Sequence, residues 1–242
     1  MQFIDLHIHT QHSDGENSIK EILKQAKKLN IGVGITDHNV VGGAIQASKQ
    51  KEVPVIPGIE VGTIENRHTV LLFYHADELQ EFYNKEIEKN KIQSKVFNWW
   101  QTKLSTTELL EISSNYNCVK IAAHPYNRIF KSKNWRPKEI PNIKKLDAIE
   151  VLNSVISMKS NAVAEKLAEK LNKSKVAGSD AHSMHHMGQA GIITKGTTTE
   201  EILNAIKKGL IQVKGKPYQF GSYIHHSYSV VKNNLLPMAT KF

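Results

Sequence analysis

The chain has 242 residues, of which 40% are hydrophobic, so it is long enough to fold as one large α/β domain. No stretch approaches the roughly 18 apolar residues of a membrane span, and Asp5 and the histidines after it interrupt the first apolar run. The single Cys118 excludes an internal disulfide framework and a cysteine-rich zinc finger. We therefore expect a cytoplasmic protein without a signal peptide, in which any metal is held by nitrogen and oxygen atoms.

Lysine and arginine outnumber aspartate and glutamate by 32 to 23, which gives a formal charge of +9. A basic protein attracts phosphate groups, on nucleic acids or on small metabolites. Lysines on helix faces can equally do no more than keep the protein soluble. The stretch 127–138 is different, because four basic residues surround Trp135 shortly after His124, and we predict that it binds phosphate. These residues are Arg128, Lys131, Lys133 and Arg136.

Short apolar runs alternate with amphipathic patterns along the chain. The patterns predict strands at 2–9, 31–36, 53–61, 69–75, 118–122, 147–152, 174–178 and 190–194. They predict helices at 17–29, 41–50, 158–171 and 199–208. This alternation indicates a parallel sheet with right-handed crossovers. Two polar helical stretches between 77 and 115 interrupt this alternation of strands and helices. We interpret them as an insertion over the site, within a single domain that spans 1–242.

Histidine and carboxylate residues stand where these strands end. His7 and His9 are two residues apart, so in a strand they point to the same face. Such side chains are costly to bury unless they are paired or bound to metal, and their repetition predicts a polynuclear metal site. Functional residues gather at the carboxyl ends of strands in parallel α/β folds. Because the candidates follow six or more strands, a closed barrel fits better than an open sheet.

Five motifs in order carry a family resemblance: His7-Ile8-His9 with Ser13-Asp14-Gly15, Thr36-Asp37-His38, Gly58-Ile59-Glu60, Ala123-His124-Pro125, and Gly178-Ser179-Asp180-Ala181-His182. Together they resemble the polymerase and histidinol phosphatase (PHP) family, from Asp5 to His182. The resemblance implies a distorted (β/α)7 TIM-like barrel that carries two or three divalent metal ions at its carboxyl-terminal face and hydrolyses phosphoesters. Histidine and carboxylate ligands without thiolates suit Zn, Mn or Fe.

The resemblance also implies a ligand set. The first metal would be held by His7, His9, Glu60 and Asp180, the second by Glu60 and His124, and the third by Asp14, His38 and His182.

One more histidine should complete the second metal, from the strand after Glu60. Leu71 occupies the position where many family members have this histidine, so the candidates are His75 and His68. We prefer His75, because it shares a strand face with Leu71.

The expected mechanism follows from the metals. Two cations lower the pKa of a bridging water and hold the phosphoryl oxygens, so a metal-bridging hydroxide would attack phosphorus beside Glu60. Arg128 or a nearby lysine would neutralise phosphate charge, and His182 or His12 would protonate the leaving alcohol.

Several other polar residues have a different expected place. Asp37 is expected to be a hydrogen-bonding support, and Asn153 either contacts substrate or packs in the barrel. The histidine pairs at 185–186 and 225–226 fit no motif and are expected at the surface. The stretch 215–242 matches no motif.

Three functions compete. The leading hypothesis is a metal-dependent phosphoesterase for a small phosphorylated metabolite or nucleotide, and a histidinol phosphatase is an alternative within the family. The Ser-Asp-Gly form of the first motif resembles the nucleotide or general phosphoesterase branch of the family more than the histidinol phosphatases. A second hypothesis is an exonuclease-type phosphodiesterase for nucleic acid, which the charge favours and the absence of an aromatic stacking ladder disfavours. A third is a scaffold that has lost its metals, which the full ligand set disfavours. We expect no membrane partner.

Overall fold

The computed structural model describes residues 1–92, 100–127 and 134–218. Arg128, Lys131 and Lys133 of the predicted phosphate loop lie outside these ranges, as do His225 and His226.

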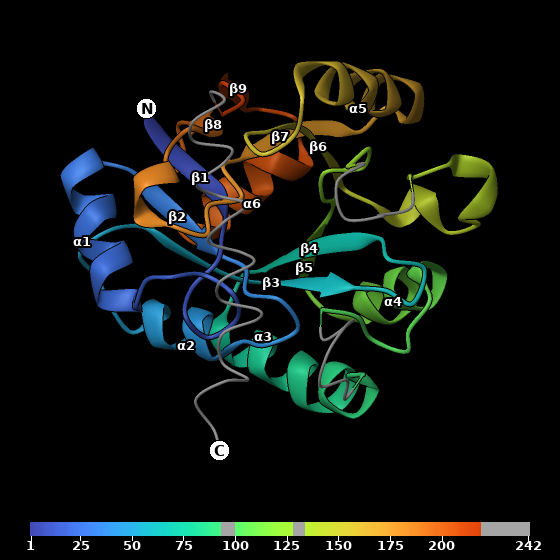
Figure 1. The fold of residues 1–242 in the computed structure, drawn as a ribbon, viewed down its shortest axis with the longest axis horizontal. Coiled ribbons are helices and arrows are strands. Elements are labelled where there is room, and N and C mark those ends of the chain that lie inside the picture. Colours follow the sequence, from blue (N-terminus) through green and yellow to red (C-terminus); the bar gives the residue numbers. More distant parts are fainter. Residues whose placement is uncertain (93–99, 128–133, 219–242) are drawn as a thin grey trace, which may run out of the picture.

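A single mixed sheet forms the centre of the molecule (Figure 1). In the described ranges its strands are β1 (Gln2–Ile8), β2 (Gly32–Ile35), β3 (Val55–Gly62), β4 (His68–Phe73), β5 (Cys118–Ala122), β6 (Ala148–Asn153), β7 (Ser174–Gly178), β8 (Ala190–Thr194) and β9 (Gln212–Gly215). Their order in the sheet is β7-β6-β5-β4-β3-β2-β1-β8-β9. The first seven strands therefore follow chain order from β1 to β7, as the strands of a barrel do.

The ring is nearly closed where β1 meets the end of β7. Ile8 and Ala181 form an isolated parallel bridge, and the backbone N–H of Ser179 donates to the Asp5 carboxylate at 2.9 Å. Next to this seam, β8 pairs antiparallel with the start of β1, from Gln2 to Ile4, and β9 pairs with β8. The predicted distorted barrel is confirmed.

The prediction of a parallel sheet is wrong for β4. β4 runs antiparallel to both of its neighbours, β3 and β5. Residues 63–67 alone separate β3 from β4, too few for the crossover that parallel strands require. They form a tight turn in which Thr63 N–H donates to the Arg67 carbonyl at 2.9 Å and Asn66 adopts a left-handed φ of 59°.

The helices pack around this sheet (Figure 1). They are α1 (Ile19–Leu29), α2 (Gly42–Ser48), α3 (Ala76–Phe82), α4 (Thr106–Ile112), α5 (Met158–Leu171) and α6 (Thr199–Lys207). Three of them begin with a capping box, in which a hydroxyl and a glutamate satisfy the first free N–H groups. The pairs are Ser18 with Glu21, Ser105 with Glu108, and Thr198 with Glu201. Among the described residues, no helix is long and apolar enough to cross a membrane.

The interrupted region between 77 and 115 packs on the barrel. Leu79, Phe82, Ile87 and Leu109 are fully buried, and they belong to the same hydrophobic cluster as Ile8 of β1. Helix α3 continues into a π-helical turn (Tyr83–Ile87) and a short 3-10 turn (Glu88–Asn90). These segments therefore share the barrel core, as expected of an insertion within one domain. That 1–242 is a single domain stays a prediction.

The burial of Cys118 generates a prediction. Its thiol is 1% exposed at the start of β5, and burial raises its pKa to about 12. Because the thiolate is the reactive form, we expect a disulfide reagent at about pH 8 to label the native protein far more slowly than the urea-unfolded chain. The unfolded chain, with its single cysteine, should release one equivalent of chromophore. Rapid stoichiometric labelling of the native protein would show that β5 is not packed as described.

Candidate metal centre

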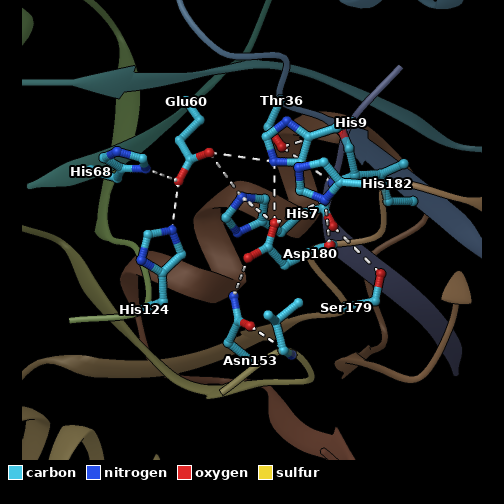
Figure 2. Close-up of polar contacts among 12 residues, drawn as sticks. His7, His9, Thr36, Glu60, His68, His124, Asn153, Ser179, Asp180 and His182 are labelled. Atoms are coloured by element: carbon cyan, nitrogen blue, oxygen red, sulfur yellow. Dashed lines mark hydrogen bonds and ion pairs between the residues drawn. The ribbon is translucent and has the colours of Figure 1, made fainter. Parts of the chain in front are cut away.

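Ten histidine, aspartate and glutamate side chains from strand ends and loops meet inside one end of the barrel, which we call the site end. Figure 2 labels His7, His9, Glu60, His68, His124, Asp180 and His182 among them. Their carriers are β1 and its following loop, the loop after β2, strand β3, the start of β4, the loop after β5, strand β6 and the loop after β7. The residues are His7, His9, Asp14, His38, Glu60, His68, His124, Glu150, Asp180 and His182. All are buried except His68, which is half-buried.

The direction of β4 decides which histidine joins this group. Because β4 is antiparallel to β3, its first residue, His68, pairs with Gly62 at the site end. His75 follows the other end of the strand, where it is exposed just before α3. The expectation that His75 joins the group is therefore wrong, and His68 takes the place. Leu71 pairs with Ile59 and lies in the hydrophobic core, so its position carries no ligand.

The Glu60 carboxylate is the hub of the group. Its Oε1 lies 2.8 Å from His124 Nε2 and 3.0 Å from His68 Nδ1. Its Oε2 lies 3.0, 3.3 and 3.4 Å from ring nitrogens of His38, His9 and His7. Burial works against ionisation, but the surrounding imidazoles hold the pKa of Glu60 well below its usual value. Glu60 is therefore an anion with histidine nitrogens on both of its oxygens.

Two further carboxylates approach the same histidines. Asp180 Oδ1 lies 3.3 Å from His9 Nε2 and 3.6 Å from His7 Nε2. Asp14 Oδ2 lies 3.1 Å from His182 Nε2. Burial opposes ionisation of both aspartates, yet the neighbouring histidines lower their pKa values. Burial lowers the pKa of His182, but Asp14 and Asp180 together outweigh burial and raise that pKa to about 9.

Several buried ring and carboxylate atoms in this group have no hydrogen-bond partner among the described residues. They are His7 Nε2, both ring nitrogens of His9, Glu60 Oε2 and His124 Nδ1. Buried polar atoms are normally paired, so this many orphans in one place need a partner that protein atoms do not supply. Within the described ranges, four sets of ligand atoms lie within 4.8 Å of one another. These sets are His7-His9-Glu60, His7-His124-Asp180, His38-Glu60-His68 and His9-Asp14-His38-His182. A nitrogen and oxygen donor set of this kind fits divalent transition metals.

In the loop between 127 and 138, the described residues are 127 and 134–138. The side chain of Trp135 is 1% exposed in the hydrophobic core, and the backbone N–H of Trp135 donates to the Pro125 carbonyl at 3.1 Å. Arg136 is exposed and lies 3.3 Å from Glu139, so it is paired on the surface. The loop is thus anchored beside His124, and the phosphate role of Arg128 stays a prediction.

Other polar residues near the site have structural partners. Asp37 accepts hydrogen bonds from the N–H and hydroxyl of Thr10 and the hydroxyl of Ser13, at 2.7 to 2.8 Å, and so holds the loop that follows His9. His12 is exposed, with its ring 3.2 Å from Gln46 Oε1.

One surface prediction is wrong. His185 is exposed as expected, but His186 is 4% exposed because a 3-10 turn places its ring against Tyr218, with centroids 4.5 Å apart.

Sequence reasoning missed Glu150, the one member of the group of ten that belongs to none of the four ligand sets. Its signal was a single charge inside the otherwise apolar run of β6, Ala-Ile-Glu-Val-Leu-Asn. Asn153, which sequence left between substrate contact and packing, is fully buried and bonded to Glu150 and Asp180.

Comparisons with known proteins agree with this geometry. Residues 159–211 match the model of a family described as PHP-associated. An uncharacterized protein from Methanocaldococcus jannaschii is 31% identical over 187 residues, which are 69% of this chain and 94% of that protein. A 3′,5′-nucleoside bisphosphate phosphatase from Chromobacterium violaceum is 35% identical over 74 residues, which are 29% of this chain and 26% of the phosphatase.

Two solved structures share the fold. The lesion-specific endonuclease PfuEndoQ from Pyrococcus furiosus superposes with a TM-score of 0.69 at 21% identity, covering 94% of this chain and 66% of the endonuclease. A two-domain protein from Bacteroides vulgatus, which contains a predicted PHP-like metal-dependent phosphoesterase, superposes with a TM-score of 0.65 at 15% identity, covering 89% of this chain and 65% of that protein. This chain therefore spans about two thirds of each of these two proteins. The motifs, the barrel and these relatives together show that the chain belongs to the PHP family of metal-dependent phosphoesterases.

Proposed function

We propose that the protein hydrolyses the phosphate ester of a small phosphorylated metabolite or nucleotide, using two or three divalent metal ions (Zn, Mn or Fe) at the site end. The observation that carries this proposal is the gathering of orphaned histidine nitrogens around the Glu60 and Asp180 carboxylates. The ligands we propose are His7, His9, Asp14, His38, Glu60, His68, His124, Asp180 and His182. Glu60 belongs to two of the ligand sets, so we propose that it bridges two ions.

In the proposed hydrolysis, the metal ions and the side chains of the protein have different roles. When bound, the ions would lower the pKa of a water and hold phosphoryl oxygens for in-line displacement. Glu60 would supply negative charge to offset the repulsion between two cations. His12 on the exposed loop after β1 would donate a proton to the leaving alcohol. His182, the other candidate, is a proposed ligand whose second ring nitrogen lies 3.0 Å from the Asp180 carbonyl, so as a metal ligand it has no proton to give to the alcohol. Arg128 or a neighbouring lysine would bind the substrate phosphate, bidentately in the case of arginine.

The relatives favour two different substrate classes. The nucleoside bisphosphate phosphatase favours a small phosphorylated substrate, although it matches only 29% of this chain. The likeness to a DNA lesion endonuclease and the formal charge of +9 favour the alternative, a nucleic-acid phosphodiesterase. We place the small substrate first.

A substrate panel tests the proposal. Phosphate monoesters, nucleoside bisphosphates, diesters and oligonucleotides would each be incubated with the Mn²⁺-loaded protein, and released phosphate and shortened oligonucleotides would be measured. Phosphate release from small monoesters that is abolished by a chelator supports the proposal. Cleavage restricted to oligonucleotides supports the alternative, and no hydrolysis with Mn²⁺, Zn²⁺ or Fe²⁺ overturns both.

Glu60→Gln should separate a bridging role from simple packing. The amide keeps the size of the side chain but removes the charge between the two ions, so we expect bound metal to fall and kcat to drop by at least about 100-fold. Elemental analysis and steady-state kinetics measure the two effects. Glu111→Gln, at an exposed glutamate of α4, is the control and should change neither. Full metal content with near-normal turnover in Glu60→Gln would contradict the bridge.

Substitutions of the two histidines that flank β4 test the ligand choice made by strand direction. His68 is 3.0 Å from Glu60, whereas His75 is exposed at the far end of the strand. We expect His68→Ala to lower bound metal by about one equivalent per chain and His75→Ala to leave it unchanged, as measured after gel filtration. Metal loss in His75→Ala alone would reverse the assignment.

Arg128→Ala tests the phosphate role predicted from sequence. A charge-assisted contact to phosphate contributes roughly 1.5 to 3 kcal/mol, so kcat/KM should fall by about 10- to 100-fold. Arg136→Ala, which removes an exposed arginine of the same loop, is the matched control and should stay within about twofold. Equal effects of the two substitutions on kcat/KM would show that the loop acts only through its general surface charge.

A further inference from the structure

Glu150 lies behind His7, on the side away from Glu60. It is 3% exposed in β6, and both of its oxygens are engaged. Oε1 lies 3.0 Å from His7 Nδ1, and Oε2 accepts the backbone N–H of His124 at 2.7 Å. Oε2 also accepts an amide hydrogen of Asn153 at 3.0 Å. One carboxylate thus contacts two proposed ligands at once.

The contact with His7 selects one form of its ring. A carboxylate only accepts hydrogen bonds, so the Nδ1 of His7 must carry the proton that lies between them. In the neutral ring Nε2 is then unprotonated, and Nε2 is the atom that faces Glu60 Oε2 at 3.4 Å and Asp180 Oδ1 at 3.6 Å. A metal-binding histidine commonly gives its other N–H to a carboxylate in this way.

Asn153 extends the support to Asp180. Its side-chain nitrogen donates to Glu150 Oε2 and, at 3.2 Å, to Asp180 Oδ2, a contact drawn in Figure 2. Its side-chain oxygen accepts the N–H of Val155 at 2.9 Å, which fixes the orientation of the amide. Asn161 of α5 bonds both the N–H and the carbonyl of Asn153, at 3.2 and 3.0 Å. Asp180 Oδ2 is thereby held, and Oδ1 is left facing His9 and His7.

Two of the supported residues, His124 and Asp180, also have unusual backbone conformations. His124 has a φ of 27° and Asp180 a φ of 54°, in the left-handed region that non-glycine residues rarely adopt. Such conformations persist only where the surroundings fix them. Glu150 bonds the backbone of His124, and Asn153 bonds the side chain of Asp180. Gly178 of β7 packs against this support so closely that a Cβ there would lie 2.3 Å from His7 Cβ and 2.9 Å from Glu150 Oε1.

We infer that Glu150 and Asn153 are positioning residues of the metal centre. Glu150 sets the ring form of His7 and fixes His124, and Asn153 turns one oxygen of Asp180 toward the ligand cluster. Neither residue belongs to a ligand set, so they act through His7, His124 and Asp180. This inference rests on the proposed function, because it assumes that those three side chains bind metal.

Glu150→Gln is the first test. Glutamine has one acceptor oxygen, so it cannot accept from His7 on one side and from His124 and Asn153 on the other. Its NH₂ group, if it faces His7, drives the ring to the form that is protonated on Nε2. We expect Zn²⁺ affinity to fall by about 10- to 100-fold, measured by competition with a chromophoric chelator. In ¹H–¹⁵N spectra of the Zn²⁺-loaded protein, the His7 Nδ1–H signal seen in the wild type should be lost or shifted.

Two further substitutions make the test specific. Asp147→Asn is the control. Asp147 lies just before β6, at the end of the strand opposite Asn153, and its carboxylate is 3.1 Å from Lys120 Nζ. This substitution should leave the Zn²⁺ affinity and the His7 signal unchanged. Asn153→Ala should lower Zn²⁺ affinity but keep the Nδ1–H signal of His7, because Asn153 acts on Asp180. A purely structural role would lower the melting temperature of the metal-free chain without altering the form of the His7 ring.

The outcomes separate this inference from the proposed function. A wild-type chain that binds neither Zn²⁺ nor Mn²⁺ would overturn the proposed function. If the wild type binds metal and Glu150→Gln stays within about twofold with its His7 signal intact, only the inference fails. If Glu150→Gln does not fold, Asn153→Ala decides: a lower Zn²⁺ affinity supports the positioning role, and an unchanged affinity overturns it.

Discussion

Burial of three carboxylates in one histidine cluster is the constraint on which the rest of the structure depends. An isolated ion in a protein interior is too costly to maintain, so Glu60, Asp14 and Asp180 are stable there only as part of a balanced set. Their pKa values are lowered by imidazoles, and those carboxylates raise the pKa values of His7, His124 and His182 against the effect of burial. In contrast, burial lowers the pKa of His38 to about 3, which keeps it neutral. Protons and metal ions therefore compete for the same nitrogen atoms, and metal binding would release protons.

This cluster requires the barrel to close, because its members come from both ends of the ring. His7 and His9 belong to β1 and its loop, and Asp180 and His182 follow β7. Asp5 ties the two together, with Oδ1 accepting the Ser179 N–H at 2.9 Å and Oδ2 the Gly188 N–H at 2.8 Å. Burial raises the pKa of Asp5 to about 6, although these hydrogen bonds favour its ionised form. The seam of the barrel is thus also the frame of the site.

The features that sequence predicted well are local ones. His-x-His, Thr-Asp-His and Gly-Ser-Asp-Ala-His each place ligand-type side chains next to a recognisable strand, so neither the strand nor its end was in doubt. The choice of His75 over His68 required the direction of β4, and strand parity does not contain that information. The short 63–67 connection did contain it, because so few residues permit only a hairpin. Glu150 was missed for a related reason, because its partners His7 and His124 are distant in sequence. Pairing of β6 with β5 brings Glu150 to His124, and closure of the ring between β1 and the end of β7 brings it to His7.

The reversal of β4 also explains how His68, the sixth histidine of the group, reaches the site without an additional crossover connection. In a fully parallel ring, each strand presents its carboxyl end to the site, and β4 would present His75. Reversal presents the first residue of β4 instead, next to Gly62, only two residues beyond the Glu60 hub. His68 therefore reaches Glu60 Oε1 from the neighbouring strand, on the same oxygen that His124 approaches from the loop after β5. Glu60 Oε1 thus has two histidine neighbours of different origin: a sequence motif predicts His124, whereas the direction of β4 determines His68.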